Sequence, residues 1–391
     1  MYNEQMIQEL RKRWNALQQA LAREGGDAIL ITTNVNLFYV SGRIFSGAAY
    51  VRPEGDPLFF VRRPVGLKGG NVIYIRKPEE IVGHLQQRGI PIPAKLFFET
   101  DSISYNEYRR YEKIFDPRVV CNGTQLLRGV RSIKTIYEIG RIMRSGVLHA
   151  RLYERIPSLY RPGMTDTELS IEIERESRRL GSLGIFRIFG QSMEIFMGSL
   201  LAGDNADAPS PYDFALGGAG LDASLPVGGN GTPLTDGTSV MVDMGGNFTG
   251  YMTDMTRVFS VGKLTDRAYK AHDTALEIQR RIEQTAAPGV PAADLYNLAV
   301  RIAADAGLSD YFMGHRQQAG FIGHGIGIEI NEAPVLAPRS KEALVPGMVF
   351  ALEPKFVIPS VGAVGIENSF LVTDNGIEKL THCEEAIVPL Q

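Results

Sequence analysis

Residues 240–259 read VMVDMGGNFTGYMTDMTRVF, and this stretch decides the fold of the part of the chain around it. The apolar residues near Val240 and Phe259 predict two strands joined by a glycine-containing turn. Each strand carries one acid among apolar neighbours, Asp243 on the first and Asp254 on the second. Two acids on a hairpin can face each other, which is unstable unless a cation or a proton lies between them. A single buried aspartate is more often a structural acid, whereas a facing pair favours metal binding.

Three segments further along the chain carry one candidate ligand each. A histidine stands between two glycines, and a glutamate stands inside each of two apolar, strand-like runs; these residues are His324, Glu353 and Glu367. The histidine alone is a weak signal. A buried glutamate needs counter-charge, because an unpaired buried carboxylate is strongly destabilising. That counter-charge is either a metal ion or a salt bridge to Arg257 or Lys355.

Taken together, the candidate ligands suit a pair of hard divalent cations; they are Asp243, Asp254, His324, Glu353 and Glu367. Their four carboxylates carry −4 against a metal charge of +4, so the centre would be neutral in a buried pocket. Oxygen-rich ligation with one imidazole favours Mn²⁺, Co²⁺ or Fe²⁺ and does not exclude Zn²⁺. Two such ions predict metal-assisted hydrolysis.

Length and composition indicate the number of domains, the kind of partner and the location of the protein. A chain of 391 residues is too long for one ordinary core, so two domains are expected. The net charge of −3, from 41 basic and 44 acidic residues, gives no reason to expect a nucleic-acid partner. The apolar runs are short for a membrane span, and the first residues lack the apolar region of a signal peptide. With Cys121 and Cys383 as the two cysteines, a disulfide framework is excluded and a cytoplasmic location is expected.

The order of predicted elements differs between the two domains. An amphipathic helix at 5–22 is followed by alternating strands and helices, which predicts an α/β N-terminal domain over residues 1–130. Beyond it, over residues 131–391, two helices followed by strands occur twice. This predicts an α+β domain with internal pseudo-twofold symmetry, whose four helices cover 134–156, 165–180, 265–286 and 291–306.

The order and spacing of the five ligands resemble those of the M24 metallopeptidases, which have the pita-bread fold and include prolidase, aminopeptidase P and methionine aminopeptidase. The segments that carry the resemblance begin at Asp254 (DMTR), Gly323 (GHGIG) and Gly365 (GIEN). The likeness runs from Ile133 to the C-terminus. The segment NLFYVSG at 36–42 is similar to the creatinase-type N-terminal domain of prolidase and aminopeptidase P, which methionine aminopeptidase lacks. The resemblance implies hydrolysis of Xaa-Pro bonds in short peptides, manganese as a metal and a homodimer.

Carried over by position, the resemblance implies that Asp243 binds the first cation and that Asp254 and Glu367 bind both. His324 and Glu353 would complete the ligands of the second cation. Glu353 would also act as the proton shuttle, first as general base and then as general acid.

The residues expected to face a substrate depart from the family pattern. Peptidase members carry one histidine before the first aspartate and another after the metal-binding histidine, and here Val227 and Asn331 occupy these places. Asn331 can still donate a hydrogen bond in catalysis, whereas Val227 cannot. Loss of a preorganised donor costs about 2.7–4 kcal/mol in the transition state. Lys355 stands where glycine usually follows Glu-Pro, and its amine could bind an anionic substrate or pair with a surface acid.

Two further residues are predicted to support the site. Thr256 would hold the orientation of the Asp254 carboxylate. Arg339, like Lys355, is a candidate anchor for a substrate carboxylate. Three functions remain open: an Xaa-Pro peptidase with an altered donor set, a non-peptidase metalloenzyme of the same fold that acts on a small metabolite, and a non-enzymatic binding protein. The complete ligand set argues against the last of these.

Overall fold

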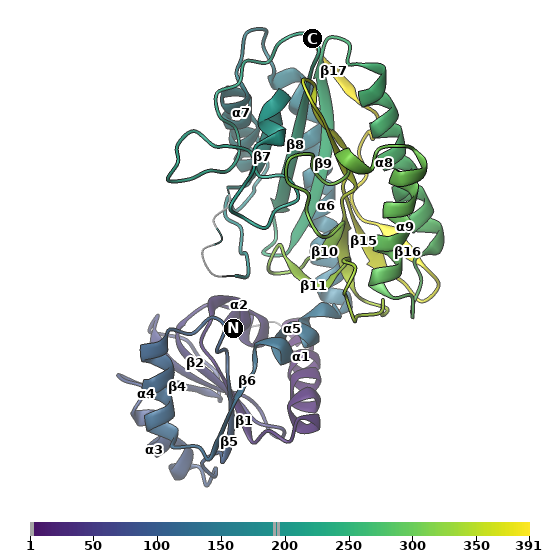
Figure 1. Cartoon of the computed structure of the whole chain (residues 1–391). Coiled ribbons are helices and arrows are strands. Elements are labelled where there is room, and N and C mark those ends of the chain that lie inside the picture. Colours follow the sequence, from purple (N-terminus) through teal and green to yellow (C-terminus); the bar gives the residue numbers. More distant parts are fainter. Residues whose placement is uncertain (1–3, 191–192, 194–195) are drawn as a thin grey trace. The chain divides into compact units, whose positions relative to one another are not determined.

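The computed structural model describes residues 4–190, 193 and 196–391. The chain forms two compact units, Met1–Arg131 and Ser132–Gln391 (Figure 1). None of the helices in these described ranges is both long and apolar enough to cross a membrane.

The first unit is built on a six-stranded sheet in the order β4-β3-β2-β1-β5-β6. β1 pairs antiparallel with β2 and parallel with β5, so the sheet is mixed. Aromatic and aliphatic side chains such as Tyr50, Phe60 and Phe98 form its core with Phe115 of a flanking helix. The strands are β1 (Ala28–Ile31), β2 (Ser46–Val51), β3 (Leu58–Arg63), β4 (Val72–Tyr74), β5 (Lys95–Phe98) and β6 (Val119–Asn122), and the helices are α1 (Glu4–Arg23), α2 (Asn34–Ser41), α3 (Glu80–Gln87), α4 (Tyr105–Phe115) and α5 (Thr124–Ser132).

Among its described residues, the second unit contains two helix pairs and three sheets. Its strands are ordered β17-β9-β8-β7 in one sheet, β11-β10-β12-β15-β16 in another, and β13-β14 in a two-stranded ribbon. The helices are α6 (Ile136–Leu159), α7 (Asp166–Arg179), α8 (Asp266–Thr285) and α9 (Ala292–Asp305). The strands are β7 (Gly198–Ala202), β8 (Thr238–Asn247), β9 (Met252–Val261), β10 (Gly323–Gly325), β11 (Glu332–Val335), β12 (Val349–Leu352), β13 (Lys355–Ile358), β14 (Gly362–Gly365), β15 (Asn368–Val372), β16 (Ile377–Lys379) and β17 (Val388–Leu390).

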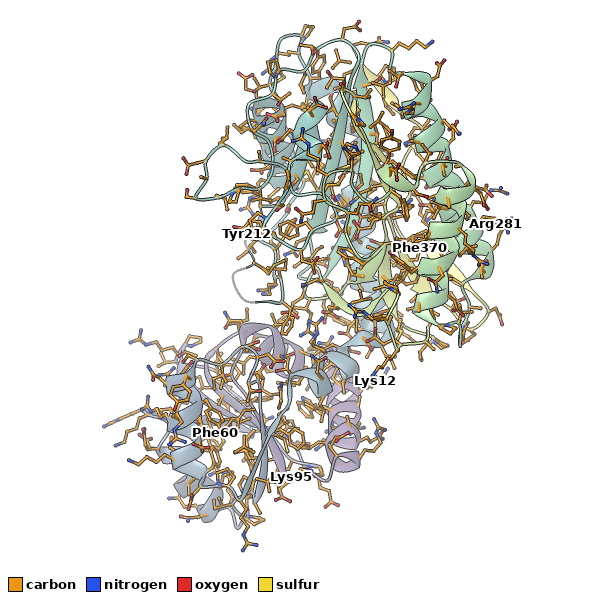
Figure 2. All side chains as sticks on the ribbon, in the orientation of Figure 1. Lys12, Phe60, Lys95, Tyr212, Arg281 and Phe370 are labelled. Carbon is orange, nitrogen blue, oxygen red and sulfur yellow. The ribbon has the colours of Figure 1, made fainter. Side chains whose placement is uncertain are left out.

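Each helix pair packs in its own apolar cluster, and the cluster of α8 and α9 also includes Leu201, Met241 and Val258 from β7, β8 and β9. Residues of α6 and α7 pack with β7, β8 and β9 in one apolar cluster, and residues of α8 and α9 pack with β12 to β15 in another. Figure 1 shows α8 and α9 along one edge of this unit and α7 across the strands from them. Phe370 lies inside the unit and Arg281 lies on the outer face of α8 (Figure 2). The predicted plan of two helices followed by strands, repeated once, is therefore confirmed.

Local sequence explains where these elements begin and turn. Helices α6 and α7 both start at a capping box, in which Thr135 and Thr165 exchange hydrogen bonds with the glutamates three residues later. The hairpin of β8 and β9 pairs Asp243 with Thr256 and Gly245 with Asp254. The two aspartates are therefore diagonal neighbours on one face of the hairpin and not direct partners, which corrects the expectation that they face each other.

Candidate metal centre

The five predicted ligands come from strands and strand ends of both halves of the second unit. Asp243 lies on β8, Asp254 on β9 and His324 on β10, while Glu353 follows β12 and Glu367 lies between β14 and β15. An isolated antiparallel β-bridge between Thr256 and Glu367 joins the hairpin of β8 and β9 to the start of β15. This junction brings together residues that are more than 100 positions apart, such as Thr256 and Glu367 with a separation of 111.

The structure places these ligands in two overlapping groups. One contains Asp254, His324 and Glu367, the other contains Asp243, Glu353 and Glu367, and within each group one ligand atom of every residue lies within 4.8 Å of the others. The exposed fractions of Asp254, Glu353 and Glu367 are 7%, 3% and 1%. His324 Nε2 lies 3.7 Å from Asp254 Oδ2 and 3.5 Å from Glu353 Oε1. Buried carboxylates at this density require positive charge beside them.

Part of that positive charge is supplied by Lys355. Its Nζ lies 2.8 Å from Asp243 Oδ2, 2.7 Å from Glu353 Oε2 and 3.2 Å from Glu367 Oε2, and its exposed fraction is 0%. The prediction that Glu353 and Glu367 form a salt bridge is thus confirmed, with Lys355 as the partner. The expectation that this amine anchors a substrate does not agree with the structure, because the ammonium is buried and bound by three carboxylates of the centre itself.

Local backbone structure directs Lys355 inward. It begins β13 and pairs with Gly365 of β14. Gly365 has φ of 151°, and a Cβ added there would lie 2.5 Å from the carbonyl oxygen of Pro354, so only glycine permits this close approach. Glu353 and Lys355 are two positions apart, and their side chains meet in a 2.7 Å contact. This spacing is a signal from which the contact could have been predicted.

The pKa shifts divide the centre into two sides. Burial would raise the pKa of Asp243, but the Lys355 ammonium outweighs it and the pKa is lowered. Burial would likewise lower the pKa of Lys355, yet the three carboxylates raise it well above its usual range. On the other side, burial and then the charges of Asp243 and Glu353 raise the pKa of Asp254 far above its ordinary value. Burial and the charge of Asp254 do the same to the pKa of Glu367.

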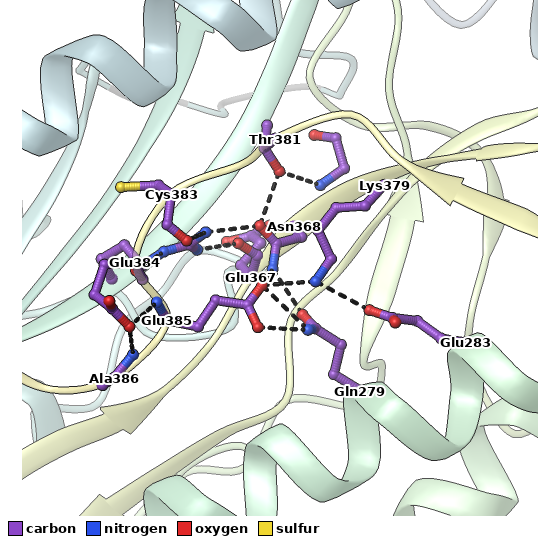
Figure 3. Close-up of polar contacts among 12 residues, drawn as sticks. Gln279, Glu283, Glu367, Asn368, Lys379, Thr381, Cys383, Glu384, Glu385 and Ala386 are labelled. Atoms are coloured by element: carbon purple, nitrogen blue, oxygen red, sulfur yellow. Dashed lines mark hydrogen bonds and ion pairs between the residues drawn. The ribbon is translucent and has the colours of Figure 1, made fainter.

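A hydroxyl and a guanidinium support Glu367. The Oγ1 of Thr256 donates a hydrogen bond of 2.7 Å to Glu367 Oε2, so Thr256 orients this carboxylate and not that of Asp254 as expected. Arg257, 2% exposed, donates to the backbone oxygens of Thr256 and Glu367 and to the side chain of Asn368. Asn368 in turn bonds Gln279, Glu385 and Thr381 (Figure 3). Sequence reasoning missed the role of Arg257, although the residue belongs to the DMTR segment.

The residues predicted to contact a substrate lie in different settings. The Asn331 side chain accepts a hydrogen bond from the backbone N–H of Phe189 and donates one to its backbone oxygen, both 2.7 Å long. Val227 is buried in the segment that precedes β8, with 2% of its surface exposed. Arg339 lies in an exposed turn between β11 and β12. A catalytic role for Asn331 and a substrate role for Arg339 stay predictions.

The fold and the cluster define a two-domain metalloprotein with a carboxylate-rich centre. Comparison with known families makes this specific: residues 140–374 match metallopeptidase family M24, and residues 13–133 match the creatinase/prolidase N-terminal domain. The chain belongs to metallopeptidase family M24. The resemblance found in the sequence, and the fold that it implied, are confirmed.

Relatives match along nearly the whole chain. An uncharacterized peptidase of Bacillus subtilis, YqhT, is 27% identical over 388 residues, which is 96% of this chain and 99% of that protein. Among solved structures, the Xaa-Pro dipeptidase from Bacillus anthracis matches with a TM-score of 0.80 and 25% identity, over 97% of this chain and 100% of that one. The prolidase from Pyrococcus horikoshii OT3 has a TM-score of 0.77 at 22% identity, over 96% and 100% of the two chains, and this likeness concerns the fold alone.

Proposed function

We propose that the chain is a metal-dependent hydrolase that cleaves Xaa-Pro bonds in short peptides. The observation that carries this proposal is the convergence of Asp254, His324, Glu353 and Glu367 on one buried centre. Membership of family M24 supports peptide hydrolysis. The similarity to a Xaa-Pro dipeptidase over nearly the whole chain supports proline as the residue after the cleaved bond.

The residues present fit a hard divalent cation. Three carboxylates and one imidazole favour Mn²⁺, Co²⁺ or Fe²⁺, with Zn²⁺ also compatible, and such an ion supplies Lewis-acid activation of water and of a carbonyl group. Glu353 is the residue to which we assign proton transfer, first as acceptor and then as donor. Its Oε1 lies 3.5 Å from His324 Nε2, on the side of the carboxylate that faces away from Lys355.

The test is hydrolysis by purified full-length protein. The protein is stripped with a chelator, reloaded separately with Mn²⁺, Co²⁺, Fe²⁺ or Zn²⁺, and incubated with Xaa-Pro dipeptides and Xaa-Pro-Yaa tripeptides. We expect cleavage of the bond before proline, and we expect it to depend on the added metal. Matched peptides with alanine in place of proline should not be cleaved. Absence of Xaa-Pro cleavage with every metal contradicts the proposal.

A second candidate is a metal-dependent reaction on a small non-peptide metabolite. It is favoured by Val227, which cannot donate a hydrogen bond, and by Asn331, whose amide is engaged by the backbone of Phe189. A missing preorganised donor typically lowers kcat by about 10²–10³-fold. The same metal-loaded preparations, incubated with small amides that carry a carboxylate, distinguish the two candidates: turnover of an amide without turnover of any Xaa-Pro peptide favours the second.

The proposal includes the organisation of the molecule. We place the domains at residues 1–130 and 131–391, and the compact units Met1–Arg131 and Ser132–Gln391 support this division. We also propose a cytoplasmic homodimer that uses manganese, as in the sequence-based expectation. Sedimentation equilibrium of the full chain tests the dimer, because a mass near the 43.0 kDa of a single chain contradicts it.

A further inference from the structure

We infer that this centre takes a single divalent cation, held by Asp254, His324, Glu353 and Glu367, and that the ammonium of Lys355 takes the place of a second cation. This inference deepens the proposed function and rests on its metal-dependent part. It replaces the count of two cations that the sequence had suggested, and it assigns Asp243 to a lysine and not to a metal.

A second cation would need the same carboxylate oxygens that the Lys355 ammonium already occupies. The three N–H groups of a lysine ammonium are matched by three carboxylate oxygens, at 2.8 Å (Asp243), 2.7 Å (Glu353) and 3.2 Å (Glu367). A divalent ion bound by these oxygens would lie about 2.0–2.2 Å from each of them. Such an ion would stand in the space of the ammonium or in direct contact with it, and both are cations. The group formed by Asp243, Glu353 and Glu367 therefore already binds a positive charge, the ammonium of Lys355.

Glu353 and Glu367 each have one carboxylate oxygen that Lys355 does not use. Within the part of the chain that the structure describes, Glu353 Oε1 and Glu367 Oε1 are buried atoms without a hydrogen-bond partner. Each glutamate thus gives one oxygen to Lys355 and keeps the other unpaired. Glu353 Oε1 lies 3.5 Å from His324 Nε2, which is itself 3.7 Å from Asp254 Oδ2. Buried polar atoms are rarely left unpaired, so these oxygens point to a ligand, and the donor set suits one cation.

Total charge does not decide between one ion and two. The four carboxylates carry −4 and Lys355 carries +1, which sums to −3; one divalent ion then leaves −1 and two leave +1. Both totals are equally far from neutrality. The position of the ammonium decides, because it is closed in by its own carboxylates and is fixed by the pairing of Lys355 with Gly365.

The test counts metal ions in the holoenzyme without using a substrate. Metal-stripped full-length protein is dialysed to equilibrium against Mn²⁺, its metal content is measured by mass spectrometry, and its electron paramagnetic resonance spectrum is recorded. We expect one Mn²⁺ per chain at saturation and the spectrum of an isolated ion. Two ions per chain, an exchange-coupled pair or no bound ion would each overturn the inference.

Variants separate the roles of the two aspartates and the lysine. Asp243→Asn should still bind one ion, because Asp243 pairs with the lysine, whereas Asp254→Asn should lose it. Lys355→Ala should raise the content to two ions, and Lys379→Ala, which removes a lysine paired with Glu283 and Glu385, should leave it at one. Loss of the ion in Asp243→Asn overturns the inference. A folded Lys355→Ala protein that binds only one ion, and not two, also overturns it. If Lys355→Ala does not fold, the wild-type count and the aspartate variants decide.

The ion count and the peptide assay fail independently. One bound ion without cleavage of any Xaa-Pro peptide keeps the inference and contradicts the proposed substrate. Two bound ions together with Xaa-Pro cleavage would contradict the inference and keep the proposed substrate.

Discussion

The Nζ of Lys355 lies 2.8 Å from Oδ2 of Asp243, although the two residues are 112 positions apart in the chain. This contact joins β13 to the hairpin of β8 and β9, and it places a permanent positive charge inside a cluster of carboxylates. A metal-dependent enzyme usually depends on its ions to hold such a cluster together. Here one side of the cluster is held by a residue of the chain, so the metal-free protein keeps part of the centre in its folded form.

Removal of the Lys355 charge should destabilise the metal-free protein strongly. In Lys355→Met the volume is nearly kept, but Asp243, Glu353 and Glu367 lose their shared partner. Breaking a buried ion pair from one side costs about 3–5 kcal/mol. Urea denaturation in the presence of a chelator measures this loss. Lys379→Met is the matched control, since Lys379 is 21% exposed and its pairs are worth about 1 kcal/mol or less. Equal losses in the two variants would contradict the assigned role of Lys355.

The stability of the metal-free protein should fall as pH rises. The pKa of Asp254 is raised far above its ordinary value of 3.8, so the folded protein holds a proton that the unfolded chain has released. Its contribution to stability is therefore fully present below pH about 4 and is lost as pH rises through the folded pKa, at about 1.4 kcal/mol per pH unit. Glu367 acts in the same direction.

The difference between wild type and Asp254→Asn isolates this effect, because the asparagine does not titrate. Urea denaturation with a chelator at several pH values should show a steeper fall for wild type than for the variant. Saturating Mn²⁺ should remove or reverse the slope, since the ion replaces the proton. Parallel curves for the two metal-free proteins would show that Asp254 does not hold this proton.

Loss of the Thr256 hydroxyl should weaken metal binding more than folding. Thr256→Val removes the 2.7 Å hydrogen bond to Glu367 Oε2 and keeps the shape of the side chain. Groups that orient metal ligands typically contribute 10–100-fold in affinity, so the dissociation constant for Mn²⁺ should rise by about that factor. Isothermal titration calorimetry measures it. Thr256→Ser keeps a hydroxyl and should restore most of the affinity, and a failure of serine to do so would indicate a packing role instead.

Asn331 should act on substrate binding through the segment that contains Phe189. Both ends of its amide are engaged by the backbone of Phe189, so Asn331→Ala frees this segment. Two hydrogen bonds are worth about 1–3 kcal/mol together, which corresponds to a rise of about 5–150-fold in KM with little change in kcat. Steady-state kinetics on whichever substrate the hydrolysis assays turn over provides the measurement. A fall in kcat at constant KM would instead assign Asn331 to the catalytic step, as the sequence suggested.

The family and the acids and histidine that converge on the centre could be predicted from the sequence, because they depend on residue types in a fixed order. An acid inside an apolar strand, as at Asp243 and Asp254, is unusual enough to be noticed from the sequence alone. The two domains followed for a similar reason, since helical and strand periodicities are local properties of the chain.

The direction of side chains could not be predicted in the same way. The sequence offered a metal, Arg257 or Lys355 as partners for the buried glutamates, and the structure shows Lys355 binding their carboxylates while Arg257 binds backbone oxygens. The hydroxyl of Thr256 likewise orients Glu367 and not the aspartate two positions before it.

The sequence by itself therefore determined which side chains assemble at the centre, and the tertiary structure decided how their charges are balanced. The reason is physical. A ligand set is defined by chemical type and order, which the chain carries locally. The partner of a buried charge depends on distances of about 3 Å between strands far apart in sequence, such as β8 and β13, and those distances exist only after the sheets have packed.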